Sequence, residues 1–223
     1  MTVSMIWRIV ATSALFLLGG CAPMYFPNKI NTPLLSHQGE VQVGFFGATS
    51  GLDIQASFAA TDQLGIMVNT SFLDEKADDA GNARKQNFGE IGLGYLHRLG
   101  DKGRLEVFGG YGRASVQSAY NNGYFVDYAN VDMNRIFIQP DVGFSGRVVE
   151  GALAMRFVIV NARQGDFSFT RSFLEPALTF KVGFPYVKFV TQAGLSLPLH
   201  SDNLVENQPV MLSFGLQGYI NRK

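Results

Sequence analysis

The chain has 223 residues, with 18 lysines and arginines, 18 aspartates and glutamates, and a single cysteine. The balanced charge excludes a global field that would steer nucleic acid to the protein, and the lone cysteine excludes a disulfide within the chain. Charged residues make up 16% of the chain, against about 25% in typical soluble domains, beside 25 glycines and 19 phenylalanines. This composition favours a β protein in contact with lipid.

Residues 1–20 have the layout of a secretory signal. Arg8 is the only charged residue among them, and Ile9 to Leu18 form an apolar stretch. The stretch has about ten residues, whereas a helix needs roughly 20 to span a bilayer. We therefore expect a cleaved leader and no transmembrane helix.

Leu18-Gly19-Gly20-Cys21 resembles the lipobox of bacterial lipoproteins. The resemblance implies that Cys21 carries a covalent lipid with palmitate-like acyl chains, and that the leader is cut between Gly20 and Cys21. It also implies sorting to the outer membrane, with the lipid anchored from the periplasmic side, because residues 22–25 contain no acid. The alternative is an ordinary signal peptide followed by an incidental free cysteine.

Residues 21–38 read as an extended, lipidated tether, because three prolines exclude a regular helix. The tether also contains apolar side chains, so we expect it to pack against another part of the protein. Residues 39–223 show period-two alternation broken by turns, which is typical of β-strands.

Ten strands fit this alternation. They are expected near 40–48, 51–60, 64–73, 88–99, 104–117, 133–146, 149–161, 172–183, 186–197 and 209–220. Short turns alternate with longer loops (74–87, 118–132, 162–171 and 198–208), as in outer-membrane barrels. An even strand count places residue 40 on the short-turn side, where the resemblance would place the lipid. Pro140 and Pro176 fall inside strands, so we expect a bulge at each.

One face of every predicted strand is apolar and carries no charge; it includes Leu52, Ile138, Phe189 and Leu212. The opposite face is rich in glycine, serine and glutamine, with a few charges. An uncharged exterior around a polar lumen predicts an all-β fold, namely a closed antiparallel up-and-down transmembrane β-barrel. The alternative is a soluble, lipid-tethered β-barrel or sandwich with its apolar face turned inward.

The polar face predicts an internal network of charges. Its acids are Glu40, Asp53, Glu90, Glu106, Asp141, Glu150 and Glu175, and its bases are Arg135, Arg156, Lys181 and Lys188. Buried charges must be paired, so we expect salt bridges that fill a narrow bore. A small acidic pore for cations is the alternative, although ten strands leave a bore that side chains can fill.

No metal site, cofactor site or catalytic group is expected. His37, His97 and His200 lack paired spacing, and adjacent residues such as His200-Ser201-Asp202 do not form a relay. The loop at 74–87 has charges of mixed sign and reads as a solvated tip, with a calcium site as the alternative. The loop at 118–132 offers Tyr120, Tyr124, Phe125 and Tyr128 as contact residues, unless longer strands bury them.

The mature chain is similar in pattern to small Gram-negative outer-membrane β-barrel lipoproteins. We expect a non-enzymatic structural or accessory role, with contacts through the loops at 74–87 and 118–132. The expected partners are outer-membrane lipid and an envelope protein, and no nucleic acid. The alternatives are a narrow channel for small solutes and a lipid- or glycan-modifying enzyme at the barrel rim. The sequence does not indicate the oligomeric state.

Overall fold

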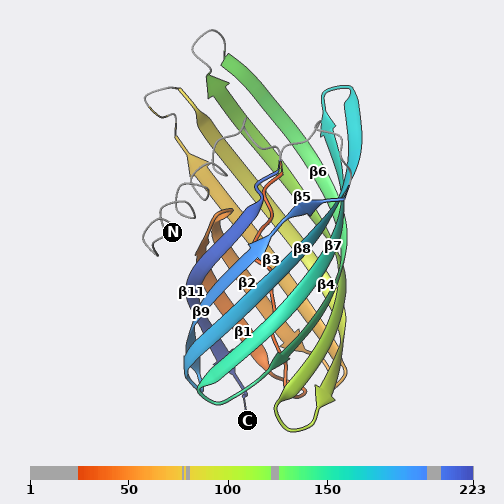
Figure 1. Cartoon of the computed structure of the whole chain (residues 1–223), viewed down its shortest axis with the longest axis vertical. Helices are drawn as coiled ribbons and strands as arrows, with labels where there is room; N and C mark the ends of the chain where they lie inside the picture. The colour runs from red at the N-terminus through yellow and green to blue at the C-terminus, as the bar shows by residue number, and fades with distance from the viewer. Residues whose placement is uncertain (1–24, 77, 79–80, 122–125, 200–206, 223) are drawn as a thin grey trace, which may run out of the picture.

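The computed structural model describes residues 25–76, 78, 81–121, 126–199 and 207–222, and these form an all-β structure. Ten antiparallel strands close into a barrel, because β8 pairs with both β7 and β9 and so joins the two edges of the sheet (Figure 1). The closed antiparallel barrel predicted from the alternation is thereby confirmed. The strands are β1 (Val41–Ala48), β2 (Gly51–Ala59), β3 (Leu64–Glu75), β4 (Ala83–Leu99), β5 (Gly103–Asn121), β6 (Val126–Phe144), β7 (Val149–Gln164), β8 (Phe167–Phe184), β9 (Val187–Leu195) and β11 (Val210–Ile220).

The two-residue strand β10 (Leu197–Pro198) continues the path of β9 along β8. The connections 60–63, 100–102, 145–148 and 185–186 lie at one end of the barrel, which we call the turn end. Glu40, which directly precedes β1, and Arg222, which follows β11 and donates to Ser145, also lie there. The other end, the loop end, carries the remaining connections. Within the described ranges, no helix is long and apolar enough to span a bilayer.

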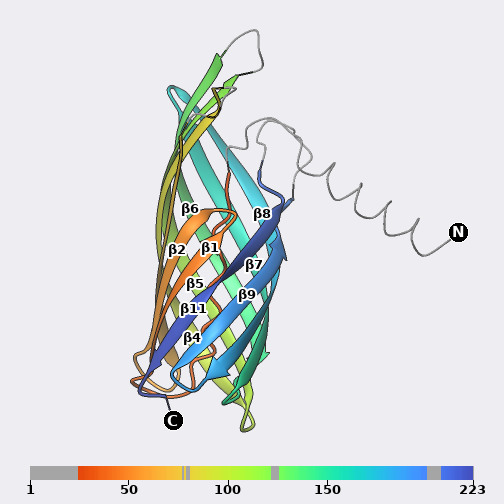
Figure 2. The ribbon, with the colours of Figure 1, turned by 90° about the vertical axis from the view of Figure 1, so that its left-hand side faces the viewer.

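Strands β4 to β8 are longer than the alternation predicts, and they project beyond their neighbours at the loop end (Figure 2). β5 and β6 pair from Gly103 with Phe144 as far as Asn121 with Val126. Most of the predicted loop at 118–132 is therefore strand. The predicted loop at 162–171 is a two-residue turn, in which Gly165 takes the positive φ of 59° that favours glycine.

The predicted bulges at the two strand prolines are wrong. Ile138 pairs with Phe157 and Asp141 pairs with Ala154, so the register is the same on both sides of Pro140. The register between β8 and the path of β9 and β10 is likewise unchanged across Pro176. Each proline interrupts the ladder locally because it lacks an N–H, but neither inserts a residue.

The apolar face of the strands points outward. Ile138 is 53% exposed and Leu212 is 54% exposed, and Leu52 and Phe189 are on the same outer surface. On β5, β6 and β7 the outward side chains change from apolar to polar at Arg113, Asn134 and Asn161, which lie opposite one another in register. An apolar band therefore surrounds the barrel and ends in a polar edge towards the loop end.

Residues 25–38, which we call the lumen segment, run through the inside of the barrel (Figure 2). Residues 25–35 are all buried, and Ile30 and Leu34 are completely so. The sequence predicts that this stretch packs against another part of the protein, but that prediction does not name the bore as the partner. The described part of the tether is therefore an internal element of the barrel.

The lumen also contains large apolar side chains, which the predicted polar lumen does not include. They lie beside glycines on neighbouring strands: Phe108 is fully buried opposite Gly94, and Phe137 packs against Gly110. The inward glycines thus leave room for aromatic rings.

We predict that Gly94→Ala destabilises the barrel by about 1–3 kcal/mol through overpacking. A methyl group at Gly94 would lie 2.3 Å from the ring of Phe108, which is completely buried in the lumen. Gly89→Ala on the same strand is the matched control, because nothing lies within 4 Å of the added methyl. Urea unfolding of both variants in lipid vesicles measures the difference, and equal stabilities would contradict the packing described.

Candidate functional site

The predicted lumen charges all lie inside the barrel. The seven acids are Glu40, Asp53, Glu90, Glu106, Asp141, Glu150 and Glu175, and the four bases are Arg135, Arg156, Lys181 and Lys188; each is at most 5% exposed. Among the described residues, Lys29 and Arg104 are two further buried bases. Arg222, beyond the last strand, also reaches inward and forms an ion pair with Glu150. Seven acids thus face seven bases.

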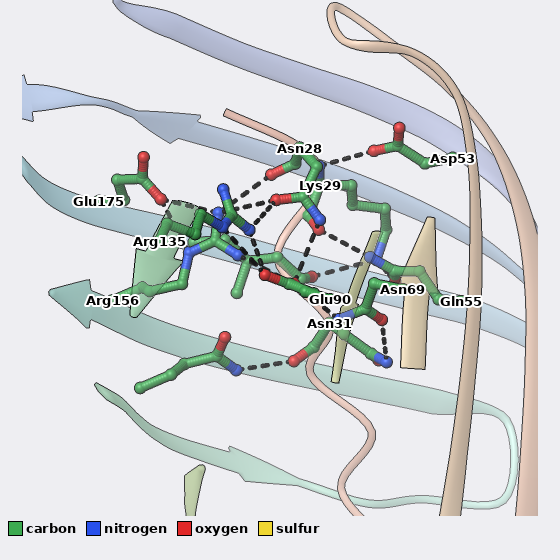
Figure 3. A network of polar contacts seen from close by, with 12 residues as sticks. Asn28, Lys29, Asn31, Asp53, Gln55, Asn69, Glu90, Arg135, Arg156 and Glu175 are labelled. Atoms are coloured by element: carbon green, nitrogen blue, oxygen red, sulfur yellow. Dashed lines mark hydrogen bonds and ion pairs between the residues drawn. The ribbon is translucent and has the colours of Figure 1, made fainter. Parts of the chain in front are cut away.

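The centre of this network is a group of four charges on four different strands (Figure 3). Glu90 on β4 forms an ion pair with Arg135 on β6 and lies 3.5 Å from Nη1 of Arg156 on β7. Arg156 also binds Glu175 on β8, with 2.7 Å between Nη2 and Oε2. The four residues form an alternating chain of charges across the bore, so each carboxylate faces a guanidinium.

The lumen segment completes this group. The Tyr25 hydroxyl donates to Glu175 at 2.8 Å and accepts from Nη1 of Arg135 at 3.1 Å. The Asn28 side-chain oxygen accepts from both Arg135 and Arg156, at 2.6 and 3.2 Å. Because these atoms satisfy donors and acceptors that the strands leave open, the segment belongs to the charge network.

A second set of contacts holds the middle of the segment against β2 and β3. The Lys29 backbone N–H donates to Asp53 at 2.6 Å, and Lys29 Nζ donates to Gln55 at 3.0 Å. The Asn31 amide donates to Asn69 at 2.8 Å, and Asn69 in turn donates to Glu90 at 2.8 Å. These hydrogen bonds connect Asp53 and the segment to the central charges.

The opposite wall holds the same stretch through an amide side chain on β9. The Ile30 N–H donates to Gln192 Oε1, and Gln192 Nε2 donates back to the Ile30 carbonyl, both at 2.8 Å. This reciprocal pair reproduces the hydrogen bonds of a strand neighbour. It gives the extended segment the backbone partners that a buried chain requires.

Further towards the turn end, Glu106 on β5 binds two successive backbone N–H groups. The Leu34 N–H donates at 3.0 Å and the Leu35 N–H at 2.7 Å. Leu34 has a φ of 57°, a conformation that is costly outside glycine and persists where surrounding contacts fix it. Lys181 on β8 donates to the Thr32 carbonyl at 2.7 Å, and Asp141 accepts from Gln139 at 3.1 Å.

At the turn end, Glu150 on β7 forms ion pairs with three basic side chains. It binds Lys188 at 2.8 Å, lies 3.6 Å from Lys181, and pairs with Arg222. The Tyr219 hydroxyl donates to its second oxygen at 3.1 Å. The turn end opens beyond this point into a vestibule of about 880 Å³, lined in part by Ser36, Arg98 and Arg222.

Little space remains beside the segment near the loop end. A cavity of about 10 Å³, lined by Tyr25, Phe26, Phe88 and Met133 among others, is the size of about one water molecule. Arg84 lies over the ring of Phe26, 4.1 Å from its centroid. Polar contacts and ring packing together occupy the bore where the segment runs.

Other predicted sites lie elsewhere or outside the described residues. Gly20, Cys21, Tyr124, Phe125, His200, Ser201 and Asp202 are outside them. Tyr128 is 74% exposed on β6, and the backbone of Tyr120 pairs with Asp127 near the tip of the β5–β6 hairpin. In the described part of the chain, no group of three or more His, Cys, Asp or Glu residues could hold a metal ion.

Sequence reasoning missed the lumen segment, although one signal could have revealed it. The predicted network has seven acids and only four bases, and such an imbalance is costly in a buried site. The missing bases include Lys29, which precedes the first strand. An unbalanced lumen beside a proline-containing segment with lysine and asparagine side chains indicates that the segment enters the lumen.

No protein-family model matches the sequence, and the search of curated proteins finds no match. Among solved structures, the chain is similar to the translocator domain of the autotransporter NalP from Neisseria meningitidis. The TM-score is 0.47 and the identity is 12%, over 96% of this chain and 95% of that one. The closed barrel described above therefore rests on the strand register of this chain.

We predict that Glu90→Gln lowers the free energy of unfolding by about 3–5 kcal/mol, because it leaves Arg135 and Arg156 without the carboxylate between them. Glu75→Gln is the control, since Glu75 pairs with Arg84 at 3.2 Å but is 56% exposed, and such pairs are worth about 0–1 kcal/mol. Urea titrations followed by gel mobility without heating report both values. An equal loss in both variants would show that the network does not hold the barrel together.

Proposed function

We propose that this chain is an outer-membrane β-barrel whose bore is filled by its own lumen segment, and that it has a structural or accessory role in the envelope. The observation that carries the proposal is the burial of residues 25–35 among charged and amide side chains of the barrel wall. A barrel filled in this way is a stable support at the membrane rather than an open pore.

The outer surface supports residence in a membrane. Its apolar band includes Phe45, Ile91, Phe180 and Leu216, each of which is more than 45% exposed. In water such a surface would drive association of the protein, whereas in the hydrocarbon of a bilayer it would be solvated by lipid. A closed barrel also pairs its backbone groups internally, as hydrocarbon requires. The long strands and the loop end then face the outside of the cell.

We predict that Ile138→Lys destabilises the barrel in lipid vesicles by about 2–4 kcal/mol, because Ile138 lies well inside the apolar band. Asn161→Lys, at the polar edge of the band, costs about 0–1 kcal/mol. Urea unfolding in vesicles measures both. A soluble barrel would tolerate both substitutions equally, since each residue would then face water, and that result would overturn membrane residence.

The same packing argues against the narrow channel. The central charges are paired with one another and with Tyr25 and Asn28, so they are not free to coordinate a passing ion. Glu106 is occupied by two backbone N–H groups of the segment. Transport would require the lumen segment to leave the bore, which breaks all of these contacts.

We predict that the purified chain gives no step-like conductance in planar bilayers. A variant in which residues 25–35 are replaced by a glycine-serine stretch of equal length conducts, because the replacement keeps the chain in place but removes its side chains from the bore. The control variant Gly89→Ala, which leaves the lumen unchanged, shows no conductance. Steady conductance by the unmodified chain would support the channel.

The loop end offers the surface for partners. Tyr128 on β6 and Phe167 at the β7–β8 turn are 74% and 79% exposed, and the exposed Glu75 on β3 forms an ion pair with Arg84 on β4. We place contacts with an envelope protein here, on the stretches at 74–87 and 118–132. A lipid on Cys21 remains part of the proposal and would add a second anchor. The proposed role is non-enzymatic.

A further inference from the structure

The direction of the lumen segment decides where the chain ahead of it lies. At its N-terminal end, Tyr25 forms a bridge with Asn207, and the Gln208 N–H donates to the Tyr25 carbonyl at 2.9 Å. Asn207 and Gln208 belong to the connection between β10 and β11, at the loop end. The ring of Tyr25 also stacks on Phe173 of β8, with centroids 4.6 Å apart. Tyr25 therefore lies at the loop end.

The C-terminal end of the segment lies at the opposite end of the barrel. The Ser36 N–H donates to Glu40 at 2.7 Å, and Arg104 donates to the Ser36 hydroxyl at 3.2 Å. The Gln38 N–H donates to Asp62 in the turn between β2 and β3, at 2.8 Å. The segment thus reaches the turn end just before it enters β1.

The register measures how far the segment travels. The ring of Phe26 lies under Arg84 on β4, and the backbone of Arg84 is opposite Ser118 on β5. At the other end of the segment, the Ser36 hydroxyl accepts from Arg104, near the start of β5. From Arg104 to Ser118 the strand rises by roughly 45 Å at about 3.3 Å per residue. Because the strand is tilted by about 40° from the barrel axis, this corresponds to roughly 35 Å along the axis. That distance still exceeds the roughly 30 Å of a hydrocarbon core. The segment therefore spans the full thickness of the apolar band.

We propose that the chain ahead of Tyr25, including Cys21, emerges on the outer face of the outer membrane. This inference rests on the proposed function, in which the loop end faces outward. Three residues separate Cys21 from Tyr25, and the four Cα–Cα steps between them reach at most about 14 Å, far too short to return to the turn end. A lipid on Cys21 would then enter the outer leaflet, not the periplasmic leaflet that the lipobox resemblance implies.

The contacts of the segment also keep it from sliding. Its amides and carbonyls are held in register by Asp53, Gln192 and Glu106, which lie at successive depths in the bore. A shift by one residue would break all three. The barrel therefore fixes the side of the membrane on which the lipidated end lies.

Thiol labelling of intact cells tests this inference. Met24→Cys, Asp166→Cys at the β7–β8 turn and Lys102→Cys at the β4–β5 turn are each treated with a membrane-impermeant maleimide, before and after permeabilisation. We expect Met24→Cys and Asp166→Cys to be labelled in intact cells, and Lys102→Cys only after permeabilisation. Labelling of Met24→Cys only after permeabilisation, with Asp166→Cys labelled in intact cells, overturns the inference.

Two further arms make every outcome informative. The unmodified chain has Cys21 as its only cysteine, so any labelling of it reports the side on which an unlipidated Cys21 lies. A short epitope inserted after Pro23 and probed with an antibody gives a second reading that does not depend on thiol access. If Asp166→Cys is labelled only after permeabilisation, the loop end does not face outward, and the proposed function fails with the inference.

Discussion

Glu90 lies between two guanidinium groups in the middle of the bore, and the rest of the interior follows from the need to satisfy charges of this kind. Arg135 and Arg156 both bind it, Asn28 and Asn69 donate to it, and Glu175 closes the chain of charges on the far side. In a bore filled by protein, none of these groups can rely on bulk water. The lumen segment supplies the partners that the strands lack, so it is part of what makes the closed barrel stable.

The two faces of each strand lie in different surroundings. Their outer faces meet an apolar solvent and are built from leucine, isoleucine and phenylalanine, whereas their inner faces must accept a polar chain and several aromatic rings. The polar chain and the aromatic rings both fit in the bore because inward glycines such as Gly94 leave space for rings on neighbouring strands. Strand alternation thus determines both the solvent outside and the shape of the space inside.

The number of strands, their order and the faces they present could be predicted from the sequence, since period-two alternation is a local signal. Ile138 and Glu90 illustrate this: their neighbours along the chain already indicate which points out and which points in. The length of β5 and β6 could not be predicted, because polar residues such as Ser118 and Asn121 resemble a loop. The same holds for the regular register at Pro140, where the neighbouring strands preserve the pairing.

The path of the lumen segment was also beyond local reasoning. Lys29 donates to Asp53 through its backbone N–H and to Gln55 through Nζ, and Ile30 binds Gln192 more than 160 positions away. No pattern within residues 21–38 encodes such distant partners. Only the surplus of acids over bases on the inner face pointed to a missing cationic element. This path changes the expected position of the N-terminal end from the turn end to the loop end.

Amide hydrogen exchange of the folded protein tests the central claim most directly, namely that residues 25–35 occupy the bore. The N–H groups of Lys29, Ile30, Leu34 and Leu35 donate to Asp53, Gln192 and Glu106 inside the barrel. We predict that these four amides exchange as slowly as those at the centre of β5, because exchange requires opening of the barrel. Exchange at the rate of an unstructured peptide would show that the segment lies outside the lumen and would contradict the account.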